Sequence, residues 1–523
     1  MIASNTSAPP ASQELGQDIL LQSARSFSSR SALVTLEANW DFGQVLERAQ
    51  CYAGAFGITE LCPGERVALL MENGPEYVAA YFGILLSGGV AVPLDCRARP
   101  EALAAILNDC GVHRWAVSAS QALAARKVLA AETPVRWTLV PEDRINLTGR
   151  VKIIRVSQVK PNEADVRTDS ATPAVINYTS GSSGCPKGVT ISHRALVANT
   201  RSIVASLDLT HEDRVMQVLP FSYCYGASLL HTHFMVGGSI TIDNRFLYPS
   251  AVMANLAQSR CTGFAGVPAT FHTLVTKCDL RSSNFPHLRY MTQAGGRLEP
   301  DLVDTVRKLI APARFYVMYG QTEASARLTC LDPAREEKRG SVGRPIAGVS
   351  LKVASDQGDE LAIGTIGEVW VRGANLMTGY WNRPDESSQV LKEGWLRTGD
   401  LGRVDQDGFL FIEGRLKEII KANGYRISPR EIEEALSRHP AVNETVVLGV
   451  PDSKAGEMIV AVVSLEMGSR PTESELLAHC KRTLADHKVP QRVVLVKDIP
   501  KSAAGKVQRE EVLKLLEHYE PIC

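Results

Sequence analysis

The sequence predicts an α/β protein with a large, multi-subdomain N-terminal portion on mainly parallel sheets, a β-rich subdomain and a small α+β C-terminal domain. Apolar runs of strand length alternate with helical patterns early in the chain, for example at 66–70 (RVALL), 90–93 and 239–242 (SITI). This alternation is typical of layered parallel sheets. From 367 to 411 the pattern changes to short strands separated by Gly and Asp turns, which indicates an antiparallel region.

A second change of pattern follows Gly414 and predicts a compact α+β unit of about a hundred residues. Ser428 and Glu431 stand three residues apart at the start of its first helix, the spacing of a capping box. The expected elements are a helix at 428–438, strands at 445–450 and 459–465, and a helix near 473–485.

Length and composition set broad limits on the protein. Its 523 residues exceed what one hydrophobic core supports, so two or more domains are expected. Lysine plus arginine and aspartate plus glutamate both number 57, and this zero net charge favours neither nucleic acid nor an anionic membrane as a partner. The eleven cysteines include no C-x-x-C pair, which predicts neither disulfides nor a zinc site and fits a reducing, cytoplasmic location.

Neither the N-terminus nor the longest apolar segment has the pattern of a membrane-targeting element. Residues 1–25 begin without the basic start and apolar core of a signal peptide, and we expect a loose tail there. The apolar segment 77–94 approaches membrane-span length. Because a Ser-Gly-Gly turn at 87–89 interrupts it and Pro93 closes it, we expect a buried helix, a turn and a buried strand, and no membrane span.

Residues 178–189, YTSGSSGCPKGV, form a loop rich in hydroxyls and glycines after an apolar strand at 173–176. A helical stretch follows from about Ser192. Backbone N–H groups, hydroxyls and a lysine can replace the water that a polyphosphate loses on binding. A flexible loop without a ligand is the alternative. The candidate phosphate-binding residues are Thr179, Ser180, Gly181, Ser182, Ser183, Gly184 and Lys187.

This loop is not a Walker A motif, because Pro186 and Gly188 occupy positions that need glycine and serine or threonine. It resembles instead the phosphate loop of the adenylate-forming enzymes, which include acyl-CoA synthetases, luciferases and the adenylation domains of peptide synthetases. Their pattern [ST]-[SG]-G-[ST]-[TS]-G-x-P-K-G is met at every position, with Cys185 at the variable one. The resemblance extends from about Ser31 to Arg509. It implies an AMP-binding adenylation domain at 26–415 and a mobile C-terminal domain at 416–523.

A second motif lies about 140 residues further on, where 319–323 read YGQTE and resemble the family's Y-G-x-T-E. The resemblance implies that Tyr319 stacks on adenine, Thr322 bonds the α-phosphate and Glu323 holds Mg²⁺, with Gly320 in the same ATP-binding segment. A flat ring suits a flat base, and a hard carboxylate suits a hard cation. A turn before an ordinary surface glutamate is the alternative.

Other motifs resemble the rest of the family's nucleotide site. The paired Gly295 and Gly296 in QAGGR are similar to the adenine-binding loop, although a plain turn has the same pattern. Asp400 in LRTGDL resembles the aspartate that accepts both ribose hydroxyls, a natural role for a carboxylate. The resemblance also implies that Arg415 makes a second contact with ribose or phosphate.

The C-terminal motifs imply a mobile catalytic lysine. Residues 501–509, KSAAGKVQR, match the family's K-x-x-x-G-K-x-x-R, which makes Lys506 the catalytic lysine. A solvated basic tail is the alternative. Lys417 falls at the family's hinge position, where the following glutamate replaces the more usual aspartate. Gly424 lies in the region that lines the thiol tunnel of relatives.

The segment 219–228, LPFSYCYGAS, borders the acyl pocket in the family. Core packing is the alternative for each ring. His231 and His233 could reach the pocket, but two histidines at i and i+2 in an apolar stretch are more often packing or surface residues than ligands. No acidic residue lies between 220 and 239, which disfavours an α-amino acid and favours a hydrophobic aliphatic or aromatic monocarboxylate. The expected pocket residues are Phe221, Tyr223 and Tyr225 as aromatic walls and Gly226 as space.

The resemblance implies an ATP-dependent and Mg²⁺-dependent acid–thiol ligase. It would form an acyl-AMP and pyrophosphate from a small carboxylic acid, then transfer the acyl group to coenzyme A or to the phosphopantetheine of an acyl or peptidyl carrier protein. An adenylate-forming amide synthetase or an amino-acid adenylation enzyme on the same fold is the alternative. A non-catalytic protein of this fold would normally lack Glu323 or Lys506, and both are present.

Overall fold

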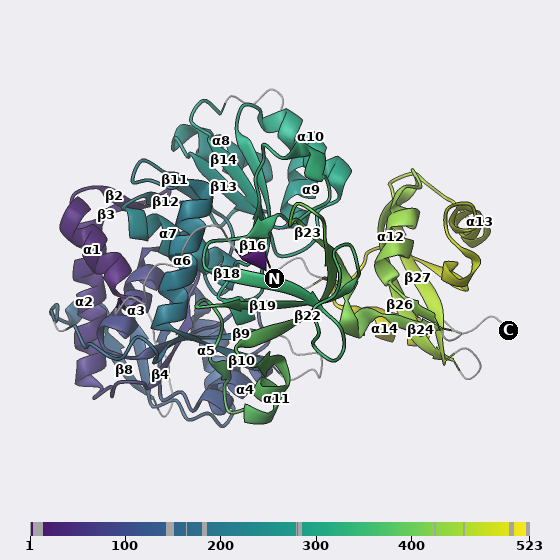
Figure 1. Ribbon diagram of the computed structural model, residues 1–523. Helices are drawn as coiled ribbons and strands as arrows, with labels where there is room; N and C mark the ends of the chain where they lie inside the picture. The colour runs from purple at the N-terminus through teal and green to yellow at the C-terminus, as the bar shows by residue number, and fades with distance from the viewer. Residues whose placement is uncertain are drawn as a thin grey trace. The chain divides into compact units, whose positions relative to one another are not determined.

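The computed structural model describes residues 2–3, 14–142, 151–163, 165–179, 186–278, 280, 285–422, 425–452, 456–501 and 507–518 (Figure 1). The chain divides into two compact units. The first comprises residues 1–351 and 371–396, and the second comprises 352–370 and 397–523. The hinge expected at Lys417 therefore falls within the second unit, and its mobility stays a prediction.

The first unit contains a nine-stranded sheet that is parallel from β15 to β2 and antiparallel at both ends. Helices α9 (Pro268–Lys277) and α10 (Pro300–Ile310) pack against it, and α8 (Pro249–Gln258) packs on α9 (Figure 1). In spatial order the strands are β17 (Arg344–Pro345), β16 (Thr329–Leu331), β15 (Arg314–Tyr319), β14 (Tyr290–Gln293), β13 (Gly263–Gly266), β11 (Arg214–Gln217), β12 (Ser239–Ile242), β2 (Ser31–Val34) and β3 (Asn39–Asp41).

The same unit contains an eight-stranded sheet that is parallel from β9 to β8. Its strands are β20 (Gly379–Tyr380), β10 (Lys187–Ser192), β9 (Pro173–Thr179), β5 (Val90–Pro93), β4 (Arg66–Leu70), β6 (Arg114–Val117), β7 (Trp137–Val140) and β8 (Lys152–Arg155). Helix α3 (Pro75–Leu86) packs on β4, β5 and α2 (Phe42–Ile58), while α4 (Pro100–Cys110) packs on α5 (Ala122–Ala130). The apolar run 77–94 is thus a buried helix and strand, as predicted.

Two buried helices lie between these sheets. Helix α6 (His193–Leu207) contacts β9 and β10, and α7 (Cys224–Val236) contacts β11 and β12. The two helices also contact each other, so they connect the sheets (Figure 1). This layering confirms the predicted α/β class with mainly parallel sheets.

The β-rich region forms a six-stranded sheet. Neighbouring strands pair antiparallel where β1 meets β18, β21 meets β22, and β22 meets β23. The strands are β1 (Ile2–Ala3), β18 (Val349–Ala354), β19 (Gly367–Gly373), β22 (Trp395–Val404), β21 (Leu391–Lys392) and β23 (Leu410–Arg415); α11 (Pro384–Val390) packs on β20 and β21. The predicted change of pattern near 367 is confirmed.

The C-terminal part of the second unit is the predicted α+β domain. Ile432, Leu436 and Leu476 from its helices pack with Val447 and Ala461 from its sheet. Its elements are β24 (Ile420–Ala422), β25 (Tyr425–Ile427), α12 (Pro429–Ser437), β26 (Val442–Asp452), β27 (Gly456–Leu465), α13 (Glu473–Thr483), β28 (Arg492–Val496) and α14 (Arg509–His518).

Most of the second half of the expected N-terminal tail is instead helix α1 (Asp18–Phe27). Ile19 and Leu20 are buried, and the helix packs on α2 and α7. Asp18 receives two hydrogen bonds from Arg167, of 2.6 and 2.9 Å. The prediction of a loose tail to residue 25 is wrong for this segment because its few apolar residues share one helical face.

The helix expected from about Ser192 is confirmed, since α6 begins at His193 with Ser192 as its N-cap. Strand β10, at 187–192, lies before it and was not expected. A second expectation near a helix start needs correction. At α12, Ser428 makes no capping bond and donates instead to the Glu413 carbonyl at 3.0 Å. A nearby backbone acceptor has therefore replaced the predicted capping box.

Among the described residues, no helix combines the length and apolar character that crossing a bilayer requires. The nine cysteines within the described ranges all carry free thiols.

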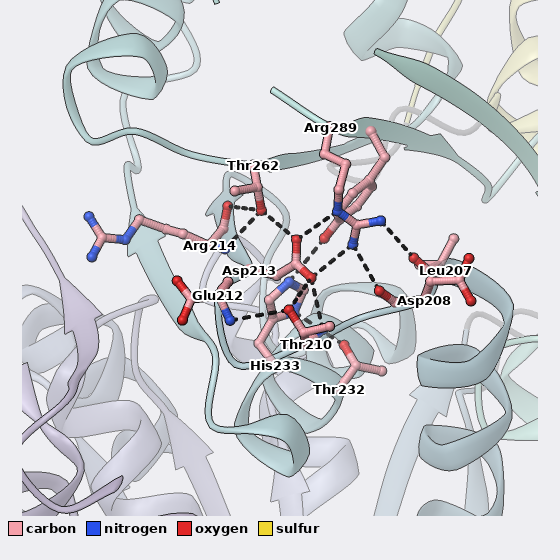
Figure 2. Close-up of polar contacts among 11 residues, drawn as sticks. Leu207, Asp208, Thr210, Glu212, Asp213, Arg214, Thr232, His233, Thr262 and Arg289 are labelled. Carbon is pink, nitrogen blue, oxygen red and sulfur yellow. Dashed lines mark hydrogen bonds and ion pairs between the residues drawn. The ribbon is translucent and has the colours of Figure 1, made fainter. Parts of the chain in front are cut away.

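Figure 2 shows a buried carboxylate, Asp213, at the amino ends of β11, β13 and β14. Arg289 donates to it through Nε at 3.0 Å and Nη2 at 2.8 Å. Thr262 donates from Oγ1 at 2.7 Å, and the Thr210 amide donates at 2.8 Å. Because Asp213, Thr262 and Arg289 each directly precede one of three neighbouring strands, this network fixes their amino ends together.

The electrostatics of the network favour an ionised Asp213. Burial alone would raise the pKa of its carboxyl, but the hydrogen bonds from Arg289, Thr210 and Thr262 outweigh burial and hold the pKa below its ordinary value. The ionised form therefore stabilises the folded state.

We expect Asp213→Asn to lower the free energy of unfolding by about 2 kcal/mol near neutral pH, because Arg289 loses its partner in a mostly buried pair. Since the folded pKa is depressed, this contribution is full above about pH 4 and disappears as pH falls through the folded pKa. Urea unfolding from pH 7 to pH 3 measures both effects.

Asp301→Asn is the matched control, because the Asp301 side chain is 94% exposed although it pairs with Arg339. That exposed pair should contribute less than about 1 kcal/mol. Equal losses in the two variants would contradict a special role for the Asp213 network.

Candidate active site

The predicted adenine-binding residues come together at the carboxyl edge of the nine-stranded sheet. Gly295 and Gly296 follow β14, and Tyr319 ends the neighbouring parallel strand β15. Gly295 has a φ of +84°, in the left-handed region that favours glycine. The Gln293 side chain donates to the Gly296 carbonyl at 2.6 Å and fixes the turn. Both glycines are exposed and Tyr319 is half-buried, which leaves backbone surface for a flat ligand.

The YGQTE segment turns sharply after β15. A Cβ atom on Gly320 would lie 1.9 Å from the Ala326 carbonyl oxygen, so only glycine permits this return of the chain. Thr322 begins the short 3-10 helix η3 (Thr322–Ala324), and its Oγ1 is 3.5 Å from Cys224 Sγ. The turn therefore places Thr322 beside the start of α7, next to the predicted acyl segment.

Glu323 is held by a residue that sequence reasoning missed. Tyr380 on strand β20 donates from its hydroxyl to Glu323 Oε1 at 3.0 Å. Burial and the nearby Glu323 charge raise the pKa of Tyr380 well above its ordinary value, so it stays a donor. Within the described residues, the other oxygen, Oε2, has no hydrogen-bond partner.

The chemistry of this carboxylate fits the Mg²⁺ assignment. In the part of the chain that the structure describes, no cluster of three or more His, Cys, Asp or Glu residues could hold a metal. Magnesium usually takes one or two carboxylates together with substrate phosphates rather than a cage of protein ligands. Glu323, with one oxygen fixed and one available, is suited to that arrangement.

Lys187 lies in the same cluster. It begins strand β10, which pairs with β20, and it forms an ion pair with Glu386. Its Nζ lies 5.4 Å from the centre of the Tyr380 ring, and its charge lowers the pKa of Glu386. Of the remaining loop residues, Thr179 ends β9, and Ser180, Gly181, Ser182, Ser183 and Gly184 lie outside the described residues.

Tyr380 thus connects the predicted phosphate-loop lysine with the predicted metal-binding carboxylate. It and Glu386 lie about 190 residues beyond Lys187 in the sequence. No spacing rule links residues so far apart, and only the pairing of β10 with β20 reveals the cluster.

Asp400 and Arg415, in the second unit, are brought together as partners on β22 and β23. Their side chains form an ion pair with Nε and Oδ1 3.0 Å apart, and Asp400 is buried. Thr398 Oγ1 accepts a hydrogen bond from the Asp400 amide at 3.1 Å. Gly399, with φ +71°, provides the bend between them.

Lys506 lies outside the described residues, but both ends of its loop are described. Lys501 bridges to Val507 and pairs with Glu444, while the Gln508 amide donates to the Pro500 carbonyl at 2.9 Å. These contacts close the two ends of the predicted lysine loop against each other.

Arg509, the last residue of that motif, ties the loop to the expected hinge. It pairs with Glu418 at 3.2 Å and Glu433 at 3.3 Å and donates to the Val447 carbonyl at 2.7 Å. Glu418 ends the 3-10 helix η5 (Leu416–Glu418), which contains Lys417. The glutamate that departs from the family pattern therefore has a partner here. Gly424 lies outside the described residues.

The four predicted acyl residues differ in placement. Phe221 is buried and lines a cavity. Tyr223 donates to Asp95 Oδ2 at 2.8 Å, and Tyr225 donates to the Thr292 carbonyl at 3.0 Å. Neither tyrosine is among the residues that line the cavity. Gly226 is needed for the turn itself, because a Cβ there would lie 2.1 Å from the Pro220 carbonyl oxygen.

The cavity lies between α6 and α7 and has a volume of about 30 Å³, room for about two water molecules. His231 lines it, which is one of the placements that the sequence left open. His233 instead packs away from it, with Nε2 3.0 Å from the Tyr290 hydroxyl. The lining residues are Tyr81, Pro93, Val175, Asn177, Ile191, Leu196, Asn199, Thr200, Phe221, Cys224, Ala227, Ser228, His231 and Ser325.

Comparison with known proteins decides the family. The AMP-binding enzyme model matches residues 20–381, and the AMP-binding enzyme C-terminal domain model matches 431–506. The chain belongs to the AMP-binding enzyme family. This confirms the predicted family. The two matches include the phosphate loop, the YGQTE segment and Lys506, whereas Asp400, Arg415 and Lys417 lie between them.

Known relatives extend over nearly the whole chain. A feruloyl-CoA synthase from Amycolatopsis sp is 31% identical over 90% of this chain and 93% of its own. A fatty acid–[acyl-carrier-protein] ligase, ScoC, from Streptomyces coeruleorubidus is 30% identical over 90% of both chains. The structure of ATP-bound MatB from Rhodopseudomonas palustris superimposes with a TM-score of 0.87 at 27% identity, covering 97% of this chain and 100% of that one. Within the family the chain falls among the AMP-forming acid–thiol ligases.

The Tyr380–Glu323 hydrogen bond gives a prediction about metal dependence. We expect Tyr380→Phe to raise the Mg²⁺ concentration needed for half-maximal activity about tenfold, because the carboxylate loses the donor that orients it. A Mg²⁺ titration at saturating ATP measures this. Tyr248→Phe, at a tyrosine that is 70% exposed, is the control and should leave the titration unchanged. If Tyr380→Phe lowers the maximal activity but leaves the midpoint of the Mg²⁺ titration unchanged, Tyr380 does not orient the carboxylate.

Proposed function

We propose that this protein activates a carboxylic acid with ATP and transfers the acyl group to a thiol. The observation that supports this best is the cluster of Lys187, Tyr380 and Glu323 in the same unit as Thr322, whose hydroxyl adjoins α7 and the cavity. A cation, a metal-suited carboxylate and a hydroxyl near a cavity between α6 and α7 are groups that adenylation requires.

In the first half-reaction, a carboxylate oxygen of the acid attacks the α-phosphorus of ATP. The bond from that phosphorus to the oxygen bridging to the β-phosphorus breaks, and pyrophosphate leaves with the electron pair. The barrier is largely electrostatic because two anions must approach each other. Thr322 would bond the α-phosphate, Lys187 and Lys506 would offset negative charge, and Mg²⁺ on Glu323 would add Lewis-acid stabilisation when bound. Gly295, Gly296 and Tyr319 would hold adenine, and Asp400 and Arg415 the ribose.

In the second half-reaction, a thiol sulfur attacks the acyl carbonyl carbon and loses its proton. The bond from that carbon to the AMP oxygen breaks, which yields a thioester and AMP. Lys506 has no role in this step. We propose that the C-terminal domain turns at Lys417 and replaces the lysine loop with the region around Gly424.

We propose that the substrate is a monocarboxylic acid whose acyl group, aliphatic or aromatic, carries no further charge. The cavity is lined by no Asp, Glu, Lys or Arg, so nothing in its lining would pair with an ammonium group or a second carboxylate. The acceptor is a phosphopantetheine thiol, on coenzyme A or a carrier protein, and assays with each acceptor distinguish the two.

Acid-dependent exchange of pyrophosphate into ATP tests the proposal and the role of Lys506. We expect exchange with uncharged acids and little with α-amino acids. Lys506→Ala should lower exchange about 10²- to 10³-fold, because it removes a charged group that stabilises the transition state, while ATP binding stays nearly normal. Lys497→Ala, at an exposed lysine nearby in the sequence, should not alter exchange. Near-normal exchange in Lys506→Ala would contradict its assignment.

The two half-reactions should respond differently to a stiffened hinge. We expect Lys417→Pro to spare adenylation and slow thioester formation, because proline fixes φ at the pivot. Single-turnover measurements of acyl-AMP formation and of transfer to coenzyme A separate the steps. An equal loss in both steps would show that position 417 is not a pivot for the second step alone.

A further inference from the structure

The cavity beside Thr322 is built from one face of each of two helices. Helix α7 supplies Cys224, Ala227, Ser228 and His231, the spacing of a single helical face. Helix α6 supplies Leu196, Asn199 and Thr200 with the same spacing. Both helices are buried between the two large sheets, so the cavity walls are fixed by the core of the first unit.

One end of the cavity is marked by the reaction site and the other by a histidine. Cys224 adjoins Thr322, where the carboxylate would meet the α-phosphate. His231 lies seven residues further along α7, about 10 Å at 1.5 Å per residue. An acyl group extending along this face therefore has its far end near His231.

The far end is polar and uncharged. His231 Nε2 lies 3.0 Å from the hydroxyl of Tyr81 on α3, and the structure records no bond at its Nδ1 to any described residue. Burial lowers the pKa of His231 to about 4, so its ring is neutral at physiological pH. Whichever tautomer is present, the His231–Tyr81 pair keeps hydrogen-bonding capacity for a neutral group.

Asn177 on strand β9 is the second polar feature of the lining. Its side chain is about nine-tenths buried, yet its amide has no hydrogen-bond partner among the described residues. A buried amide without a partner costs free energy unless water or a ligand satisfies it. The other asparagine of the lining, Asn199, is by contrast satisfied by the backbone of Arg327.

The hydroxyls of the lining can accept further hydrogen bonds. Thr200 donates to the Leu196 carbonyl and Ser228 to the Tyr225 carbonyl, both within their own helical turns. Each oxygen retains a lone pair. A purely hydrocarbon acyl chain would cover these groups and Asn177 without replacing the water that satisfies them.

We propose that the acid taken by this site is short and carries a neutral hydrogen-bonding substituent, such as a hydroxyl or keto group, toward the end remote from its carboxylate. Asn177 and the His231–Tyr81 pair recognise that substituent. This inference rests on the proposed function and narrows its substrate. An unsubstituted acid of equal size leaves Asn177 desolvated and unpaired, and sites built on such bonds discriminate strongly against analogues that lack them.

The test uses acids matched in size that differ in one polar group: 4-hydroxybutanoate against pentanoate, and 6-hydroxyhexanoate against heptanoate. Calorimetric titration into the full-length protein with AMP present gives the Kd of each acid. Pyrophosphate exchange with the same acids gives kcat/KM. We expect the hydroxy acid of at least one pair to be favoured about tenfold or more in both measurements.

Two variants assign the preference to the cavity. Asn177→Leu and His231→Phe should each bring the ratio of kcat/KM between matched hydroxy and methyl acids toward one. The Kd of the methyl acid should stay within a few-fold of the wild-type value. Asn255→Leu is the control. Asn255 lies on α8, outside the cavity lining, and its amide donates to Asp243. This variant should leave the ratio unchanged. If Asn177→Leu does not fold, Asn177→Ala replaces it.

The outcomes separate this inference from the proposed function. If pyrophosphate exchange occurs and both methyl acids are used as well as or better than their hydroxy partners, the inference is overturned and adenylation still stands. A Kd preference for hydroxy acids without exchange by any acid overturns the proposed function and leaves the polar cavity standing. A preference that survives both cavity variants overturns the assignment to Asn177 and His231.

Discussion

The buried carboxylate of Asp213 fixes the frame on which the candidate site depends. It collects hydrogen bonds from Arg289, Thr262 and the backbone at the amino ends of three adjacent parallel strands (Figure 2). Parallel strands fixed at one edge also have a defined register at the other. The turns after β14 and β15, which contain Gly295 and Tyr319, leave from that opposite edge. The stabilising network and the candidate adenine site thus lie at opposite ends of one sheet.

Much of the architecture could be predicted because its elements have local patterns. The strands at 66–70, 90–93 and 239–242 were identified from short apolar runs, and the structure has them with the same bounds. Glycine positions such as Gly320 follow motifs that reflect a steric need, here a backbone approach of 1.9 Å. Where an alternative partner lies nearby in space, as for Ser428 and the Glu413 carbonyl, a local rule failed.

The groups that complete the candidate site could not be predicted, because tertiary structure alone brings them together. Tyr380 reaches Glu323 only because β20 pairs with β10, and Tyr81 meets His231 across two helices from distant parts of the sequence. Asn177 has no motif of its own and follows a run of apolar residues, 173–176, in strand β9. Its missing hydrogen-bond partner is visible only once its neighbours are placed.

The ion pair between Lys187 and Glu386 bears on how the phosphate loop would take up its ligand. The Glu386 side chain is 34% exposed, and exposed or half-exposed pairs contribute at most about 1 kcal/mol. A polyphosphate carries far more negative charge than one carboxylate, so it would displace Glu386 at small cost. Meanwhile the pair and the Tyr380 ring hold Lys187 in one place, which reduces the side-chain entropy lost on binding. The weak pair therefore prepares the lysine without blocking it.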